Sequence, residues 1–366
     1  MANQVIANQT LDCSKTLDLS RWAIVAHKDD TGFGRMAADY KRLLGIERHL
    51  VIPSERLTDK PLTAPQEVWL RPEDTLLRLQ EVLSGLQGIL FFERSGWHPQ
   101  LLPTAKEMGI RTVCVPMWEW FNAKDPLWKN CDLFICPNRQ CCDVLRRFGF
   151  RNAVLLPTLL DVTVFPRREV CGPARVFVHN AGLVDHDDRK GTRDVIRAFA
   201  RMRRQDVRLI VRMQKEAELP EEARDPRITV HVGSLSDPSA LYSEGDVAVQ
   251  PSKMEGIGFM VLEPVCCGLP VITLDYGPMN EFVRQPEMRV RKQPFARRAF
   301  PSQWIKQAHL RLPSSSDLTR RMEWCAENDL SAISRENRRW AGETFAPQPL
   351  KAAWEEVLQA RLLNSV

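Results

Sequence analysis

Residues 247–274 read VAVQPSKMEGIGFMVLEPVCCGLPVITL, and this stretch decides the fold. Apolar runs at 247–249 and 270–274 enclose a glycine-rich turn and a segment that predicts a helix beginning near Gly258. The stretch therefore predicts a strand, a loop, a helix and a second strand. The free N–H groups and the dipole at the start of such a helix favour a bound phosphate.

Two carboxylates, Glu255 and Glu263, stand eight residues apart around this turn. Along one continuous helix, eight residues rise about 12 Å and leave the side chains about 80° apart, so both carboxylates can hold one ligand only if Glu255 lies in the loop. Such a ligand is long, with hydroxyl groups at both ends and phosphate between them, which is the shape of a nucleotide sugar. A solvated helix carboxylate is the simpler alternative for Glu263.

Strand and helix patterns alternate on both sides of this stretch, which predicts an α/β protein with parallel sheets covered on both faces. We expect a loop at 29–35 before a helix that ends at Leu44, a helix at 190–204, and a mostly helical stretch at 302–363. The predicted division of the chain is a polar leader (1–20), a first Rossmann-like domain (21–160), a proline-containing linker (161–173), a second Rossmann-like domain (174–340) and a terminal helix that packs back on the first domain (341–366).

Composition limits the class of protein. A chain of 366 residues exceeds the size of one core, so two domains are expected. The net charge of +5 is too small by itself to indicate nucleic acid. The chain has no run of 18 apolar residues and begins with a polar segment, so we predict no transmembrane span and a cytoplasmic protein, or one of the host cytoplasm if it is viral. Contact with a membrane surface stays open. None of the ten cysteines makes a C-x-x-C pair, so no metal site is predicted.

The order of residues around the two carboxylates is more specific than their spacing. Pro251 and Ser252 precede the first glutamate, Gly256-x-Gly258-Phe259 follows it, and a Gly-x-Pro-Val-Ile run comes later, at 268–272. This order resembles the retaining glycosyltransferases of the two-domain GT-B fold, in the group called family 4, whose signature is Glu-x7-Glu.

The resemblance implies two Rossmann-like doubly wound domains that face each other across a cleft, with a C-terminal helix that crosses back to the first domain. It also implies that Glu255 holds hydroxyls of the donor sugar and Glu263 the ribose hydroxyls of a UDP- or GDP-sugar, a donor substrate that needs no further cofactor. Gly256, Gly258 and Phe259 would line the donor site.

Two features of the second domain concern the donor diphosphate. The segment from His179 to Gly182, followed by Arg189 and Lys190, resembles the family's diphosphate clamp, and cations there stabilise the leaving group without a metal. Lys190 matches the family's lysine. The family's arginine is replaced by Leu183, and Arg189 or His186 is a candidate substitute, with a solvated surface charge as the alternative.

The first domain supplies further candidates. Gly32 and Gly34 follow the first predicted strand and can bring backbone N–H groups near a phosphate or the acceptor. Where relatives place a histidine beside the reacting sugar, this chain has Glu119 between two tryptophans, and an unpaired carboxylate there would have a raised pKa. Glu119 is a candidate acceptor-holding residue or base, or it pairs with a nearby cation. His98 is a candidate site residue or a helix cap.

The acceptor is the least determined part. Residues 284–311 carry eight basic residues against one acid, Glu287, and interleave the aromatic residues Phe295, Phe300 and Trp304. This pattern suits nucleic acid, and it also suits a solvated face or a docking site for anionic lipid or polysaccharide. We therefore predict a retaining, metal-independent glycosyltransferase whose acceptor is a glycan, a lipid-linked glycan or a hydroxymethylated base of viral DNA. The alternative is a non-catalytic nucleic-acid or glycan-binding protein on a degraded GT-B fold.

Overall fold

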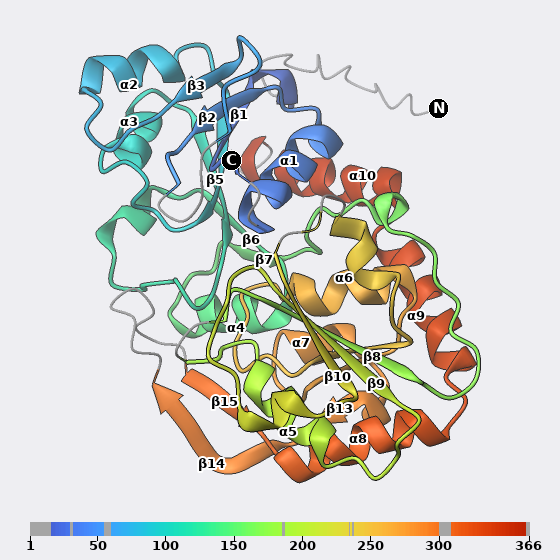
Figure 1. Cartoon of the computed structure of the whole chain (residues 1–366). Helices are drawn as coiled ribbons and strands as arrows, with labels where there is room; N and C mark the ends of the chain where they lie inside the picture. Colours follow the sequence, from blue (N-terminus) through green and yellow to red (C-terminus); the bar gives the residue numbers. More distant parts are fainter. Residues whose placement is uncertain are drawn as a thin grey trace, which may run out of the picture.

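A computed structural model of the chain describes residues 16–29, 32–54, 60–184, 187–233, 235, 238–299 and 309–363 (Figure 1). Part of the predicted leader (1–15), His186 and the segment 300–308, which contains Phe300, Trp304 and Lys306, lie outside the described residues.

Seven parallel strands form the sheet of the first domain, in the order β3-β2-β1-β4-β5-β6-β7. The strands are β1 (Trp22–Ala26), β2 (Arg48–Val51), β3 (Glu67–Trp69), β4 (Gly88–Glu93), β5 (Arg111–Pro116), β6 (Leu133–Cys136) and β7 (Ala153–Leu155). The connecting helices are α1 (Gly32–Leu44), α2 (Leu76–Leu83), α3 (Leu101–Glu107) and α4 (Arg139–Arg147). Every residue of β1 and β6 is buried, as expected for a parallel sheet with helices on both faces.

Six parallel strands form the second sheet, in the order β10-β9-β8-β11-β12-β13. The strands are β8 (Val176–Gly182), β9 (Arg208–Met213), β10 (Ile228–Val232), β11 (Val247–Gln250), β12 (Val271–Leu274) and β13 (Arg289–Val290). Helices α5 (Thr192–Ala200), α6 (Phe259–Cys267) and α7 (Met279–Phe282) belong to this half, with a short 3-10 helix, η6 (Pro238–Tyr242).

The end of the chain joins the two halves. Helices α8 (Ser315–Glu327) and α9 (Ser331–Thr344) pack on the second domain, and α10 (Pro347–Leu358) crosses to the first domain beside α1 (Figure 1). Trp354 is fully buried, its indole N–H donates to the carbonyl of Pro157 over 3.0 Å, and its ring packs edge-on against Tyr40. The predicted fold class, including the helix that crosses back, is therefore confirmed. The predicted domain boundaries stay a prediction.

Several predicted elements differ from the observed ones. Helix α1 begins at Gly32, so both glycines of the Gly-x-Gly segment lie in its first turn instead of in a preceding loop. Helix α5 begins at Thr192 and not at Lys190, because Gly191 takes a left-handed conformation (φ 76°) as its N-cap. In the stretch predicted as mostly helical, the first described residues form a strand, β15 (His309–Pro313), which pairs antiparallel with β14 (Lys292–Ala299) before the helices follow.

No helix in the described part of the chain combines the length and the apolar composition that crossing a bilayer requires.

Candidate functional site

The Glu255 loop leaves β11 and ends at Gly258, which caps α6 in a left-handed conformation (φ 92°). Glu255 therefore lies in the loop, whereas Glu263 lies in the second turn of α6, which is the arrangement that the spacing required. Both carboxylates are buried. The loop is fixed from the first domain, because the indole N–H of Trp118 donates to the carbonyl of Glu255 over 2.7 Å and Asn138 Nδ2 donates to that of Gly256 over 2.8 Å.

Two cations hold the Glu255 carboxylate. Lys190 Nζ lies 2.6 Å from Oε1, and Arg189 Nη1 lies 3.1 Å from Oε2. Burial acts to raise the pKa of Glu255, but the two cations outweigh it and lower that pKa to about 2. Glu255 is therefore an anion at any physiological pH, and it stands beside positive charge that a diphosphate can use.

Further contacts join the loop of Lys190 to the loop of Glu255. They involve Lys253, Asp188 and Asp194, which the sequence analysis did not single out. Lys253 is buried and pairs with Asp188 over 3.1 Å and with Asp194 over 2.9 Å. The backbone N–H of Lys253 donates to the carbonyl of Arg189, over 2.8 Å. At Gly191 an added Cβ would lie 3.0 Å from the carbonyl oxygen of Pro251, so the two loops touch. These contacts hold the cations at a fixed distance from Glu255.

Glu263 is contacted from both domains. The hydroxyl of Tyr242 donates to Oε2, and Arg35 Nη2 of α1 lies 3.5 Å from Oε1. Burial raises the pKa of Glu263 above its ordinary value, with Arg35 and Tyr242 acting in the opposite direction. Arg35 brings the start of α1 to the Glu263 carboxylate.

The glycines of α1 allow this close approach. A Cβ on Gly34 would lie 2.4 Å from the carbonyl oxygen of Asp29, so only glycine fits there. An added Cβ on Gly32 would lie 3.9 Å from the ring of Phe259, the first residue of α6. The structure thus brings the Gly32 and Phe259 segments together, as the resemblance implied for a cleft between two domains.

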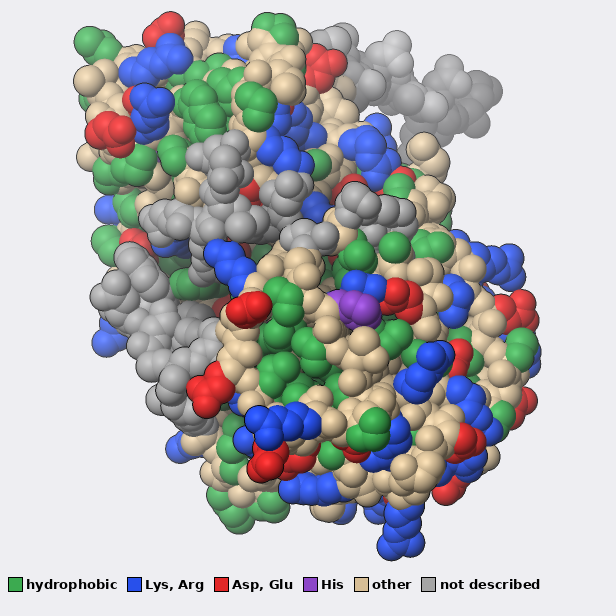
Figure 2. All heavy atoms as spheres, viewed as in Figure 1, with side chains coloured by type: hydrophobic (Ala, Val, Ile, Leu, Met, Phe, Trp, Pro, Cys, Tyr) green, Lys and Arg blue, Asp and Glu red, His purple; other side chains and the backbone are tan. Residues whose placement is uncertain are grey.

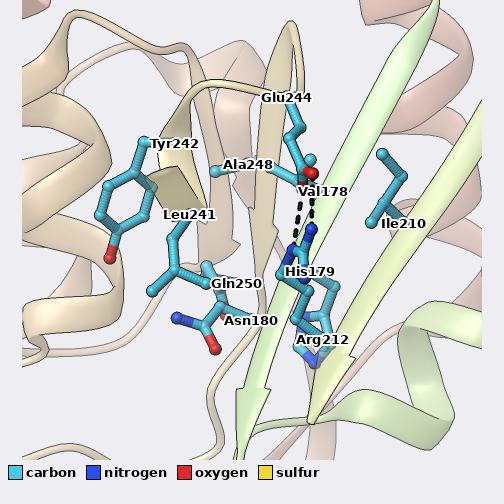
Figure 3. Close-up of a pocket in the computed structure, with 10 residues that line it drawn as sticks. All are labelled: Val178, His179, Asn180, Ile210, Arg212, Leu241, Tyr242, Glu244, Ala248 and Gln250. Atoms are coloured by element: carbon cyan, nitrogen blue, oxygen red, sulfur yellow. Dashed lines mark hydrogen bonds and ion pairs between the residues drawn. The ribbon is translucent and has the colours of Figure 1, made fainter. Parts of the chain in front are cut away.

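A small pocket adjoins the Glu263 side of the site (Figure 3). Asn180 and Gln250 lie beside Leu241, and the Arg212–Glu244 ion pair closes the other side. Tyr242 lines the pocket and donates to Glu263, whereas neither Glu255 nor Glu263 lines it. The pocket is therefore linked to Glu263 through Tyr242.

His179 also lines this pocket, and its ring holds neighbouring elements of the second domain together. One ring nitrogen bonds to the carbonyl of Val249 over 2.7 Å, and the other bonds to the hydroxyl of Thr192 over 2.9 Å. Burial lowers the pKa of His179 to about 4, so the ring is neutral. It ties β8 to β11 and to the start of α5. At the end of β8, Gly182 has φ 58°, and Leu183 beyond it is exposed.

Glu119 lies against the Glu255 loop from the first domain. Its Oε1 would be 2.4 Å from a Cβ on Gly256, and its Oε2 is buried without a hydrogen-bond partner. Burial raises the pKa of Glu119 to about 8, with Arg189 acting against the rise. The expected alternative, a pairing cation, is absent from the ion pairs of the described residues. Glu119 is therefore a largely protonated carboxyl beside the Glu255 carboxylate.

The other first-domain candidate, His98, is engaged elsewhere. Its Nε2 bonds to the carbonyl of Asp74 over 3.1 Å, and its Nδ1 accepts from the backbone N–H of Gln100 over 3.1 Å, at the start of α3. The structure therefore places His98 in the turn before α3, bonded to backbone groups, and it does not bring the ring together with Glu255.

The family comparison agrees with the geometry of the second domain. Residues 174–299 match the family model of the glycosyl transferases group 1. This part of the chain belongs to that family. Glycogen synthase of two Mycobacterium tuberculosis strains, H37Rv and CDC 1551 / Oshkosh, is 32% identical over 147 residues, which are 37% of this chain. The chain spans about a third (34%) of the length of these curated relatives.

Several solved structures resemble this chain in fold over more than nine tenths of its length. Anabaena Alr3699/HepE in complex with UDP and glucose superposes with a TM-score of 0.70 at 12% identity, over 93% of this chain and 99% of that one. Sucrose-phosphate synthase of Thermosynechococcus elongatus gives 0.63 at 14% identity, over 94% and 99%. The lipopolysaccharide outer core galactosyltransferase WaaB gives 0.62 at 12% identity, over 93% and 99%. These matches confirm the GT-B fold of both domains.

Proposed function

We propose that the protein transfers a sugar from a nucleoside diphosphate sugar to an acceptor hydroxyl with retention of configuration. The observation that carries this proposal is the buried Glu255 carboxylate before α6, held by Lys190 and Arg189. Glu255 accepts hydrogen bonds from the sugar hydroxyls, and Glu263 accepts them from the ribose. A uridine donor is supported by Anabaena Alr3699/HepE, which was solved with UDP-glucose, and a guanosine donor stays an alternative.

The reaction follows from the charges at the site. The acceptor oxygen bonds to C1 of the sugar on the face that the diphosphate leaves, the bond from C1 to the diphosphate oxygen breaks, and that oxygen takes the acceptor proton. Lys190 and Arg189 stabilise the negative charge that develops on the diphosphate. Since side-chain cations supply this charge, we propose that the reaction needs no divalent metal.

Glu119 is the first-domain residue best placed for the acceptor. A protonated carboxyl next to the Glu255 loop can donate a hydrogen bond to an acceptor hydroxyl or accept one from it, and Oε2 is buried without a hydrogen-bond partner that would compete. We propose that Glu119 orients the acceptor or the sugar at the reacting centre. His98 is left out of the proposed site because both ring nitrogens are bonded to backbone groups.

Donor turnover by Glu255→Gln tests the proposal. Wild-type protein is expected to hydrolyse or transfer the sugar of UDP-glucose or a GDP-sugar in the presence of a metal chelator, and the variant is expected to lose at least about 100-fold in kcat/KM. Glu355→Gln, on the exposed face of α10, is the matched control and should leave turnover unchanged.

The alternative, a non-catalytic binding protein, rests on Leu183 at the family's arginine position. It predicts that neither donor binds in a thermal-shift assay and that Glu255→Gln changes nothing. That result would overturn the proposed transferase.

A further inference from the structure

The β14–β15 hairpin stands out from the second domain as a separate two-stranded ribbon (Figure 1). Its described residues, 292–299 and 309–313, include four Lys or Arg residues and no Asp or Glu. On the visible face of the second domain, in contrast, basic and acidic side chains are interspersed (Figure 2). The hairpin is therefore a local concentration of positive charge on a chain of small net charge.

None of the hairpin cations whose side chains are described is paired with a carboxylate of the described residues. Within the described residues, Lys292, Arg297 and Arg311 have no carboxylate at ion-pair distance; Lys292 and Arg311 instead lie over the ring of Tyr276, at 5.6 and 5.7 Å. Neighbouring arginines of the same domain are paired, such as Arg284 with Glu336 at 2.9 Å. Unpaired cations on an exposed ribbon are available for an anionic partner.

The side chain of Phe295 is a second feature of the hairpin that indicates a binding site. This side chain is 100% exposed, and the backbone of Phe295 has φ 57°, a left-handed conformation that is unfavourable for a non-glycine residue. The register of the hairpin shifts between Lys292 and Arg297, so a bulge turns Phe295 away from the protein. A strained backbone that presents an aromatic ring to solvent, between cations, is a feature of a binding site for a planar group.

The hairpin is connected to the reacting centre. The backbone N–H of Arg311 donates to the carbonyl of Lys253 over 3.0 Å, two residues before Glu255. Leu310 is fully buried in the same apolar cluster as Trp118, and the Tyr276 ring packs edge-on against that tryptophan at 6.3 Å. Trp118 donates to the carbonyl of Glu255. A molecule bound to the hairpin thus lies next to the Glu255 loop.

We propose that the β14–β15 hairpin binds nucleic acid as the acceptor, with Lys292, Arg297 and Arg311 on phosphates and Phe295 stacked on a base. This inference rests on the proposed transferase function, since the strand would present a hydroxyl-bearing base to the sugar. A single exposed ring among cations matches one base and its neighbouring phosphates. A membrane-inserting surface gathers several apolar side chains on one face. In the transfer, the base hydroxyl oxygen bonds to C1 and its proton leaves on the released diphosphate.

Salt-dependent binding of a labelled oligonucleotide of about 20 nucleotides, single-stranded or duplex, tests this inference by fluorescence anisotropy. Replacing both Lys292 and Arg297 by Ala should lower the slope of log K against log salt by about 1.5–2. Phe295→Ala should weaken binding about tenfold with the slope unchanged. Arg203→Ala and Phe148→Ala, which remove an exposed arginine and an exposed phenylalanine elsewhere, should have no effect.

The outcomes separate this inference from the proposed function. If wild-type protein turns over a nucleotide sugar but binds no oligonucleotide near 50 mM salt, the hairpin inference is wrong and the transferase stands. Tighter binding to vesicles of anionic lipid than to DNA, lost in the Lys292 and Arg297 double variant, would also overturn it in favour of a membrane. If the oligonucleotide binds as expected and Glu255→Gln leaves donor turnover unchanged, the transferase proposal fails alone. Sugar transfer to DNA that contains hydroxymethylcytosine, reduced by Phe295→Ala, would support both.

Discussion

At the scale of single residues, the site depends on two glutamates in opposite protonation states. Glu255 is surrounded by Lys190 and Arg189, so its pKa falls to about 2, whereas Glu119 is buried without a cation at bonding distance, so its pKa rises to about 8. Glu255 belongs to the loop before α6, and Glu119 lies against Gly256 of that loop from the first domain. Were both ionised, they would repel each other in a buried space, and the neutral form of Glu119 avoids this like-charge pair.

Glu119→Gln should therefore show a pH-dependent gain in stability. Between the ordinary value of 4.5 and about 8, the unfolded wild type loses the Glu119 proton while the folded protein keeps it, so the free energy of unfolding of the wild type falls as pH rises. The amide variant escapes this loss, and its advantage should grow by at most about 1.4 kcal/mol per pH unit and level off above about 8.

Urea unfolding midpoints of both proteins from pH 5 to 9 measure this difference. The neutral histidines His49 and His179 also titrate on unfolding, but they are common to both proteins and cancel. Parallel midpoint curves for the two proteins would mean that Glu119 ionises normally in the folded state.

At the scale of elements, the side chain of Asn138 links the N-cap of α4 to the Glu255 loop. Its Oδ1 accepts from the backbone N–H of Cys141 over 2.9 Å at the start of α4, while its Nδ2 donates to the carbonyl of Gly256. One side chain therefore stabilises α4 and positions the Glu255 loop of the other domain.

Two substitutions separate these tasks. Asn138→Ser keeps an oxygen for the cap but is too short to reach Gly256, and Asn138→Ala loses both contacts. We expect kcat/KM for the donor to fall about 10- to 100-fold in both variants, because the loop is no longer held in place. Only the alanine variant should lose the further ~1 kcal/mol of a helix cap, as measured by chemical denaturation. Wild-type turnover in Asn138→Ser would show that the contact to Gly256 positions nothing.

The elements also show what the sequence predicts well. Strands β11 and β12 follow the short apolar runs 247–249 and 270–274, so their positions were predicted to within a residue. Strand β3 has only three residues and carries a buried glutamate, and β14 contains a proline and three cations, so neither has a strand-like pattern.

The residues of the site also differ in how well the sequence predicts them. The positions of Glu255, Glu263 and Lys190 follow a local motif, so their places in the structure agree with the sequence reading. Tyr242 and Lys253 carry no local signal. Their partners are set by the fold, 21 residues away for Tyr242 and 65 for the pair of Lys253 with Asp188, and only the packed sheets bring them together.

At the scale of the whole molecule, α10 fastens the first domain to the end of the second. Trp354 is its anchor, since the ring is fully buried against Tyr40 and the indole N–H satisfies the Pro157 carbonyl in the segment between the sheets. The residues proposed to contact the donor lie mainly on the second domain and Glu119 lies on the first, so the proposed turnover requires the two domains to be held together.

Trp354→Ala should accordingly destabilise the contact between the two domains more than it destabilises either domain. Removing a buried tryptophan costs about 3–5 kcal/mol, and we expect calorimetry to resolve two transitions, of which only the second-domain transition shifts when donor is added. Trp354→Phe keeps most of the packing and loses the hydrogen bond, so it should cost about 1–3 kcal/mol and preserve a single transition. If Trp354→Ala instead lowers one cooperative transition uniformly, α10 is an ordinary part of a single folding unit, and the domains are coupled through the contacts of Trp118 and Asn138 with the Glu255 loop.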